Sequence, residues 1–225
     1  MIYVLEDDED LCNLIAHSIR TVGHEAKAFY RPSDMYNAIK KKKPELIILD
    51  LMLPEENGIT VLKKLRKDMS TEDIAIIILT AREEEYQMVH ALESGADDYI
   101  TKPFRATVLT ARINALLRRT RPSSEGNVLK FKDLTLNPAA RKVSMAGENV
   151  SLTTREFDLV CLLMRKKGKV LSRNYILSEL WGEDAFVEER IIDSHIRSIR
   201  AKLGKCGQYI RSVRGVGYVM GESDD

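Results

Sequence analysis

The first half of the chain alternates short apolar runs with segments of helical periodicity, and this pattern restricts the fold more than any other feature. The runs are rich in β-branched residues and lie at residues 2–5, 46–51, 74–79 and 99–100, and a weaker strand, "EAKAF", is predicted at residues 25–29. After the first run, apolar residues recur at helical spacing, at Leu11, Leu14, Ile15, Ile19 and Val22. Wholly apolar strands are typical of parallel sheets covered by helices on both faces. We therefore predict an α/β domain with a doubly wound, five-stranded parallel sheet.

Side chains capable of phosphoryl chemistry follow these predicted strands. In such folds ligands bind at the carboxyl ends of the strands. Glu6 and Asp7 stand at the end of the first strand and Asp50 at the end of the third. Thr80 ends the fourth, and Lys102 follows the fifth. Three carboxylates in one place require a cation such as Mg²⁺, and a carboxylate can itself attack phosphorus. An amine, a hydroxyl and a metal would then neutralise the phosphoryl oxygens, so the pattern predicts a phospho-accepting aspartate.

The acidic cluster "EDDED" at residues 6–10 contains more acids than one metal site needs. Asp8 to Asp10 precede the periodic run that begins at Leu11. Acidic side chains at this position cap free N–H groups and suit the positive end of the helix dipole. We expect the cluster to divide into metal ligands, Glu6 and Asp7, and a helix start.

Five motifs in order resemble the receiver domain of two-component response regulators. They are "VLEDDE", "LIILDLMLPEENG", "IIILTA", "GADDYITKPF" and the helix end "LLRR", and they span residues 1–119. The resemblance implies that a sensor histidine kinase phosphorylates Asp50. It also implies that Mg²⁺ is held by Glu6, Asp7, Asp50 and the carbonyl of Met52.

The same resemblance assigns a switch to the ends of the fourth and fifth strands. Thr80 and Lys102 would contact the phosphoryl group, and Tyr99 would be an aromatic residue whose rotamer follows Thr80. The Lys102–Pro103 bond would be cis. Tyr99 as a plain core residue remains an alternative.

A homodimer formed on activation is also implied, through a face made of the fourth helix, fifth strand and fifth helix. Its candidate residues are Asp97, Asp98, Arg112 and Arg118. Val108 stands where the family pattern usually has an acid for an intersubunit salt bridge, and Gln87 stands where a basic partner is expected. We expect the dimer to form without that pair.

The second half differs in charge and in pattern. Residues 121–225 hold 18 Lys and Arg against 14 Asp and Glu, whereas residues 1–120 hold 17 against 20. Residues 120–127, "TRPSSEGN", have the composition of a linker. A strand-rich stretch follows, and then three helices, the first two with a Thr cap and a Ser cap. The third, about residues 188–203, is amphipathic and has an Arg and Ser face that can enter a major groove.

Residues 128–220 resemble the winged-helix effector domain of the OmpR/PhoB subfamily. The motifs are "SRNYILSELWG", "IIDSHIRSIRAKL" and "IRSVRGVGY". The predicted domains are thus a receiver at residues 1–119, a linker at 120–127 and a C-terminal α+β winged helix-turn-helix domain at 128–225. The resemblance implies DNA contacts from Arg190, Ser194, His195, Arg197, Ser198, Arg200, Lys202, Arg214 and Tyr218. The alternative for His195 is packing inside the domain. The alternative for Arg200 is an internal ion pair.

Other classes of protein lack their signatures here. The chain has no GxGxxG after the first strand and no P-loop motif, and Met52 stands where a dehalogenase-type phosphatase needs a second Asp. Three scattered cysteines and the absence of an 18-residue apolar run indicate a cytoplasmic protein without membrane contact.

The resulting hypothesis is a phosphorylation-dependent transcription regulator and not an enzyme, beyond slow self-dephosphorylation. Its partners would be double-stranded DNA, the sensor histidine kinase, RNA polymerase and a second copy of the chain. The alternative is a regulator that binds DNA constitutively and uses the receiver only for docking or dimerisation.

Overall fold

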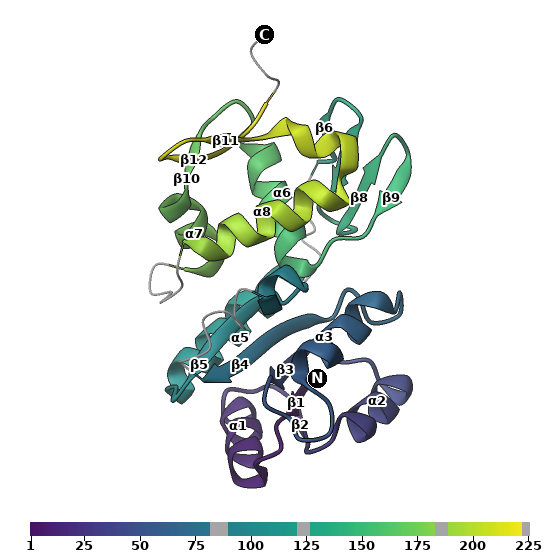
Figure 1. Ribbon diagram of the computed structural model, residues 1–225, viewed down its shortest axis with the longest axis vertical. Helices are drawn as coiled ribbons and strands as arrows, with labels where there is room; N and C mark the ends of the chain where they lie inside the picture. The colour runs from purple at the N-terminus through teal and green to yellow at the C-terminus, as the bar shows by residue number, and fades with distance from the viewer. Residues whose placement is uncertain (82–89, 121–126, 183–188, 222–225) are drawn as a thin grey trace. The chain divides into compact units, whose positions relative to one another are not determined.

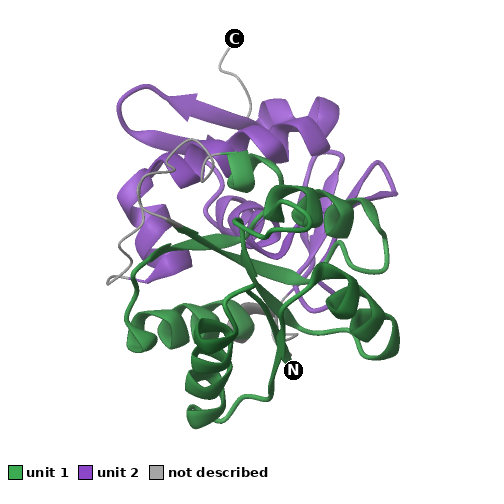
Figure 2. Cartoon of the chain, turned by 60° about the horizontal axis from the view of Figure 1, so that its bottom comes forward, with its two compact units in different colours: residues 1–120 green, residues 121–225 purple. Residues whose placement is uncertain are grey.

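The computed structural model describes residues 1–81, 90–120, 127–182 and 189–221. The chain divides into two compact units, residues 1–120 and residues 121–225 (Figure 2). Within the described segments, no helix combines the length and the apolar character needed to cross a membrane.

The first unit is built on the predicted five-stranded parallel sheet (Figure 1). Its strands are β1 (Ile2–Leu5), β2 (Ala26–Phe29), β3 (Leu46–Asp50), β4 (Ala75–Ala81) and β5 (Asp98–Lys102). The spatial order is β2-β1-β3-β4-β5, so the order reverses between β1 and β3. Ligands of doubly wound sheets bind at this reversal, outside the carboxyl ends of the strands.

Helices cover both faces of this sheet. They are α1 (Glu9–Thr21), α2 (Pro32–Lys41), α3 (Gly58–Lys67) and α5 (Ala106–Thr120), and residues 90–93 are also helical. Figure 1 shows α1 and α5 on one side of the strands and α2 and α3 on the other. Alternate residues of β1 serve the two faces: Val4 packs in the core beneath α1 and α5, while the Tyr3 hydroxyl donates to the Lys42 carbonyl, just past α2.

The buried face of α1 contains the predicted Ile15 and Ile19 but not Leu14 or Val22. Leu14 is 61% exposed, and Val22 lies past the last helical residue and is also exposed. The residues that pack against the sheet are Cys12, Ile15, Ala16 and Ile19. The prediction for Leu14 was wrong because the side of α1 that packs against the sheet contains Cys12 and Ala16, and Leu14 does not lie on that side.

The start of α1 agrees with the predicted division of the acidic cluster. The Asp8 side chain accepts a hydrogen bond of 3.0 Å from the Leu11 amide and is the N-cap, while Glu9 and Asp10 lie in the first turn. These acids therefore serve the helix end.

The described part of the second unit contains two small antiparallel sheets and three main helices. The first sheet consists of β6 (Leu129–Phe131), β7 (Leu134–Asn137), β8 (Lys142–Met145) and β9 (Glu148–Val150). The helices are α6 (Thr154–Arg165), α7 (Arg173–Trp181) and α8 (Arg190–Lys202), with the 3₁₀ helix η1 (Gly204–Tyr209) after them. The second sheet has the order β10-β12-β11, formed by β10 (Leu171–Ser172), β12 (Gly217–Met220) and β11 (Ile210–Val213). This is the predicted winged helix.

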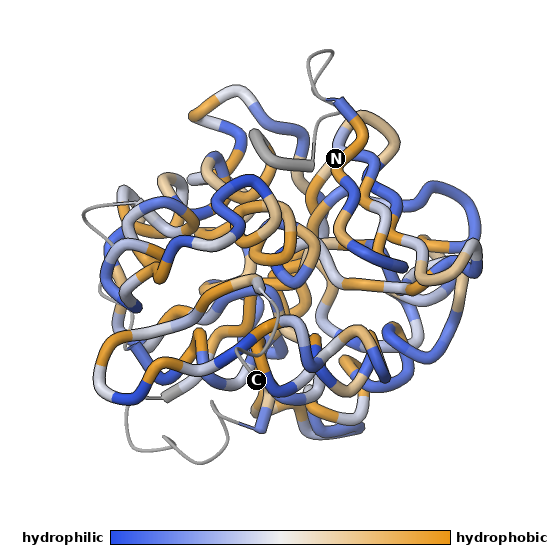
Figure 3. Tube along the Cα trace, turned by 90° about the horizontal axis from the view of Figure 1, so that it is seen from above, coloured by the Kyte–Doolittle hydropathy of each residue, from blue (hydrophilic) through white to orange (hydrophobic). Residues whose placement is uncertain are grey.

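Both predicted caps of the second unit are present. Thr153 and Glu156 form a reciprocal capping box at the start of α6, and the Ser172 hydroxyl accepts from the Tyr175 amide at 3.1 Å at the start of α7. Hydrophilic and hydrophobic stretches alternate along the trace, as the blue and orange segments of Figure 3 show. The amphipathic elements form because one side of each is apolar.

Candidate phosphoacceptor site and candidate DNA interface

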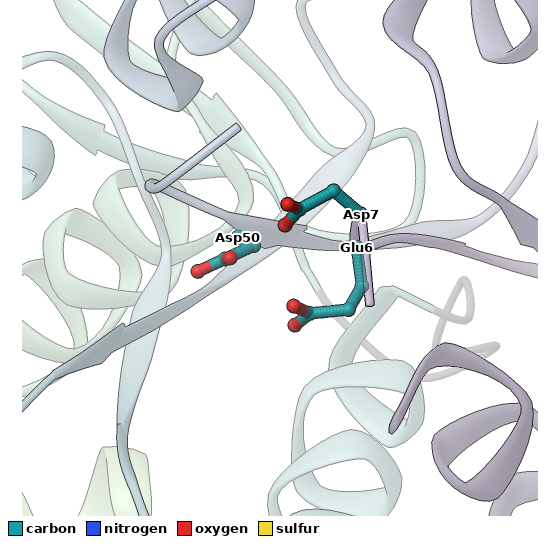
Figure 4. Close-up of side chains that lie close together, drawn as sticks. All are labelled: Glu6, Asp7 and Asp50. Carbon is teal, nitrogen blue, oxygen red and sulfur yellow. The ribbon is translucent and has the colours of Figure 1, made fainter. Parts of the chain in front are cut away.

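Three carboxylates meet at the carboxyl ends of β1 and β3. The two strands pair in parallel with Leu5 opposite Leu49, so the residues that follow lie side by side. Glu6 and Asp50 are buried, at 1% and 2% exposure, whereas Asp7 is exposed. One carboxylate oxygen from each lies within 4.8 Å of those of the other two (Figure 4). Oxygen ligands at this spacing fit a hard divalent ion such as Mg²⁺.

Lys102, at the end of β5, is the cation closest to this group in the described structure. Its Nζ lies 2.7 Å from Glu6 Oε2 and 3.2 Å from Asp50 Oδ2. Burial raises the pKa of Glu6 to about 7; the Lys102 hydrogen bond opposes this shift and the Asp50 charge adds to it. Burial alone would lower the pKa of Lys102, but its contacts with Glu6 and Asp50 reverse the direction, and the pKa is raised. The ammonium therefore stays charged beside the two acids.

The remaining predicted switch residues come from β4 and β5. Thr80 is buried and pairs across the sheet with Thr101, one residue before Lys102. Tyr99 is buried opposite Ile78. The Lys102–Pro103 bond is cis. The phosphate-contacting and switching roles of Thr80 and Tyr99 stay predictions.

The loop between β3 and α3 adds a residue that sequence reasoning missed. A Cβ at Gly58 would lie 2.2 Å from the Asp50 carbonyl oxygen, and the Gly58 amide donates to the Leu51 carbonyl at 3.0 Å. The start of α3 thus packs directly on the backbone of the phosphoacceptor position. The signal was the Asn57–Gly58 pair, since Asn57 caps α3 by accepting from the Ile59 amide. Met52 follows β3 with an exposed side chain, and its carbonyl as a metal ligand stays a prediction.

Two acids predicted for the dimer face are used inside the receiver. Asp97 is fully buried and accepts from Arg66 Nη2 at 2.9 Å. Asp98 accepts from Arg112 Nη1 at 2.9 Å and 3.0 Å. The prediction that Asp97, Asp98 and Arg112 are available at the surface is therefore wrong for this structure, because each satisfies a buried charge of its own chain. The Arg118 side chain and Gln87 lie outside the described residues.

The helix α8 and the tip of the wing present exposed arginines. Arg190 and Arg197, two turns apart on α8, are exposed. Arg214 is exposed in the turn between β11 and β12. Guanidinium groups on a helix and on an adjacent hairpin are suited to phosphate oxygens and guanine edges.

Other residues predicted to face DNA are turned inward. Ser194, His195 and Tyr218 are buried, so the prediction that Ser194 and Tyr218 face DNA is wrong for this structure, whereas the burial of His195 agrees with the packing alternative. The His195 ring lies 5.8 Å from the Trp181 ring, and the Tyr218 hydroxyl donates to Asp193 at 2.6 Å.

Three further predicted contacts are also made within the domain. Ser198 and Lys202 donate to the buried Glu156 at 2.5 Å and 2.6 Å. Arg200 donates to the Ile210 carbonyl at 2.7 Å, so this contact within the domain is a hydrogen bond to the backbone, whereas an ion pair was the alternative considered. Helical periodicity could not distinguish Ser198 and Lys202 from Arg190 and Arg197. All four are polar residues of α8, although the first two contact Glu156 and the other two are exposed.

Comparisons with known proteins agree with both units. The family "Response regulator receiver domain" matches residues 2–114, and "Transcriptional regulatory protein, C terminal" matches residues 147–220. The phosphate regulon transcriptional regulatory protein PhoB of Rhizobium meliloti is 38% identical over 97% of both chains. The DNA-binding response regulator MtrA of Mycolicibacterium smegmatis is 37% identical, covering 98% of this chain and 96% of MtrA.

Solved structures show the same architecture. A single-site mutant of RitR is 28% identical over 98% of both chains, with a TM-score of 0.79. The response regulator DrrB of Thermotoga maritima, an OmpR/PhoB homologue, is 27% identical over 98% of both chains, with a TM-score of 0.52. With its acidic site at the sheet edge and its winged helix, the chain belongs to the response regulators, as a transcription factor of the OmpR/PhoB type.

Proposed function

We propose that phosphorylation of Asp50 by a sensor histidine kinase switches this regulator to a homodimer that binds promoter DNA. The observation that carries the proposal is the buried Asp50 carboxylate, which lies beside Glu6, Asp7 and Lys102 at the edge where β1, β3 and β5 end. A carboxylate at the end of a strand, among acids and beside an ammonium, is placed as a phosphoacceptor requires.

Phosphoryl transfer requires little of the protein beyond positioning and charge neutralisation. An Asp50 carboxylate oxygen forms a bond to phosphorus as the bond from phosphorus to the histidine nitrogen of the kinase breaks. Lys102, 3.2 Å from Asp50, neutralises charge on the transferred group, and the Thr80 hydroxyl donates to one of its oxygens. Glu6, Asp7, Asp50 and the Met52 carbonyl would hold Mg²⁺, which when bound supplies further neutralisation of the phosphoryl oxygens.

The charge added by phosphorylation leads to dimerisation and DNA binding. A phosphoryl group brings about −1.5 to −2 charges to the Asp50 position and draws Thr80 and Lys102 toward it. The face formed by the fourth helix, β5 and α5 then pairs with a second copy. Two winged helices in one dimer bind DNA through Arg190, Arg197 and Arg214, and RNA polymerase is the final partner. The chain accepts phosphate and at most removes it slowly by itself.

Asp50→Asn tests the phosphoacceptor directly. Incubated with Mg²⁺ and acetyl phosphate, the wild-type chain should gain one phosphoryl group by intact mass, and Asp50→Asn should gain none. Asp10→Asn, which removes an exposed acid from the first turn of α1, serves as the control and should react like the wild type. Phosphorylation of Asp50→Asn would contradict the assignment.

DNA affinity separates the switched regulator from a constitutive one. Titration of a duplex selected from random sequences should give tighter binding after phosphorylation of the wild type. Equal affinities before and after phosphorylation would support the constitutive alternative.

A further inference from the structure

Two polar residues in the second half of α8 converge on one buried carboxylate. Glu156, in the first turn of α6, is 1% exposed. It accepts hydrogen bonds from Ser198 Oγ at 2.5 Å, from Lys202 Nζ at 2.6 Å and from the Thr153 amide at 2.8 Å. A single side chain thus closes the cap of α6 and holds the second half of α8.

The charge of Glu156 is retained in this buried position. Burial on its own would raise the pKa of Glu156, but the charge of Lys202 and the hydrogen bonds from Lys202, Ser198 and Thr153 outweigh it, and the pKa is lowered. A buried carboxylate with donors on both oxygens tolerates little displacement, because moving any donor leaves an unsatisfied charge.

The first half of α8 is fixed by a separate contact. Asp193 accepts from Arg173 Nε at 2.8 Å and from the Tyr218 hydroxyl at 2.6 Å. Arg173 begins α7 and Tyr218 lies in β12, so this contact ties α8 to its neighbouring helix and to the wing. Helix α8 is therefore held near both of its ends by a carboxylate.

Two anchor points determine the rotation of α8 about its own axis. Ser198 and Lys202 are four residues apart and therefore lie on the same side of the helix, toward α6. With that side turned toward Glu156, Arg190 and Arg197 remain exposed. If α8 were rotated about its axis by one residue position, Arg190 and Arg197 would be turned away from the DNA groove.

We propose that Glu156 is a positioning residue for DNA recognition, and that Ser198 and Lys202 serve this contact and do not bind DNA. The proposal rests on the proposed DNA-binding function of α8. It changes the role of two residues that sequence reasoning assigned to the DNA surface.

The test uses the full-length phosphorylated chain and measures affinity for two duplexes, a selected site and a scrambled one, over a range of salt concentrations. The variants are Lys202→Met, Ser198→Ala and Glu156→Gln, and Arg197→Met is the matched control for an exposed cation. Each phosphate contact contributes about −0.9 to the slope of log K against log salt. Arg197→Met should therefore lower the slope by about 0.9, whereas Lys202→Met should leave it unchanged.

A displaced recognition helix loses specificity. The ratio of the affinity for the selected duplex to that for the scrambled duplex should fall roughly tenfold in Lys202→Met and in Glu156→Gln, the size expected for two residues in contact. The double variant should lose no more of this ratio than either single variant. A general loss of folded protein would lower both affinities equally and leave the ratio unchanged. Ser198→Ala removes one hydrogen bond only, so it provides a mild variant with the same expected pattern.

Two results would overturn the proposal: a salt slope lowered in Lys202→Met as much as in Arg197→Met, or losses in Lys202→Met and Glu156→Gln that add in the double variant. Failure of DNA binding itself is a different outcome. A wild-type chain that does not distinguish the two duplexes contradicts the proposed function.

Discussion

At the scale of single residues, the candidate phosphoacceptor site places one lysine beside two buried acids. Lys102 lies within 2.7 Å of Glu6 and 3.2 Å of Asp50, both of which are almost fully buried. The ammonium offsets the negative charge that would otherwise oppose the approach of Asp50 to a phosphoryl group.

Replacement of this lysine should impair phosphorylation without preventing folding. In Lys102→Met the rate of phosphoryl transfer from acetyl phosphate should fall by about 10²-fold, the size of effect seen when one charge-stabilising donor is removed. Lys67→Met removes an exposed lysine at the end of α3 and should react at the wild-type rate. The time course of the mass increase gives both rates, and a wild-type rate in Lys102→Met would refute the role.

Magnesium should be needed for the same reaction. Excess EDTA should stop phosphorylation by acetyl phosphate, and addition of Mg²⁺ should restore it, because Glu6, Asp7 and Asp50 bring three carboxylates to the point of attack. Undiminished phosphorylation in EDTA would show that Lys102 alone supplies sufficient neutralisation.

The cysteines provide a test of burial. Cys12, Cys161 and Cys206 are all buried, and burial raises the pKa of each thiol, that of Cys12 to about 11. The thiolate is the reactive form, so at pH 8 the folded chain should react with iodoacetamide far more slowly than the chain in urea. Intact mass over time measures both rates, and equal rates would contradict the burial.

At the scale of elements, the start of α3 is part of the phosphoacceptor site. Gly58 allows the helix to approach the Asp50 carbonyl to a distance that no Cβ could occupy. The helix end therefore supports the strand end on which the reactive side chain stands.

Gly58→Ala should destabilise the receiver by about 1–3 kcal/mol, because the added methyl group meets backbone atoms that cannot rotate away. Gly221→Ala is a suitable control, since its Cβ would have only the Arg211 Nη2 atom nearby, at 3.5 Å. Urea unfolding of the two variants measures the difference. Equal stability would mean that the loop between β3 and α3 relaxes without cost.

The contact between α6 and α8 should make the stability of the second unit depend on pH. The folded-state pKa of Glu156 lies below its ordinary value of 4.5, so the contact contributes fully above that pH. The contribution is lost as pH falls below 4.5 toward the lower folded-state pKa. Glu156→Gln should cost about 1–3 kcal/mol at pH 7 and progressively less in acid. Urea unfolding followed by the fluorescence of Trp181 measures this, and a difference that stays constant with pH would refute the explanation.

At the scale of the whole molecule, the two units divide the chemistry. The receiver contains the acidic site and the face proposed for dimerisation, and the winged helix contains the exposed arginines. Asp97 and Asp98 pair within the receiver, so dimerisation through this face must use other polar groups or exchange these pairs.

Phosphorylation should convert the chain to a dimer. Sedimentation velocity should show a shift from monomer to dimer on treatment with acetyl phosphate and Mg²⁺, and Asp50→Asn should remain monomeric under the same conditions. Arg112→Ala, which removes two hydrogen bonds and a paired charge from the buried Asp98, should be less stable by about 1–3 kcal/mol. A wild-type chain that stays monomeric when phosphorylated would contradict the switch.

The sequence alone determined the fold class and which candidate site residues lie together. Apolar runs define strands wherever both faces are buried, and the carboxyl ends of parallel strands must share one edge. Glu6, Asp50 and Lys102 could therefore be placed together from their positions at the strand ends. The cap of α6 at Thr153 and the stop of α7 at Gly182 were equally local, because their partners are within four residues.

Only the tertiary structure decided which polar residues pair inside the chain. Asp97 and Arg66 are 31 residues apart, and Glu156 and Lys202 are 46 apart. Periodicity gives the face of a helix that is polar, but a buried ion pair and an exposed DNA contact use the same residue types. Which of the two a residue forms depends on how neighbouring elements pack, and that is a property of the folded chain.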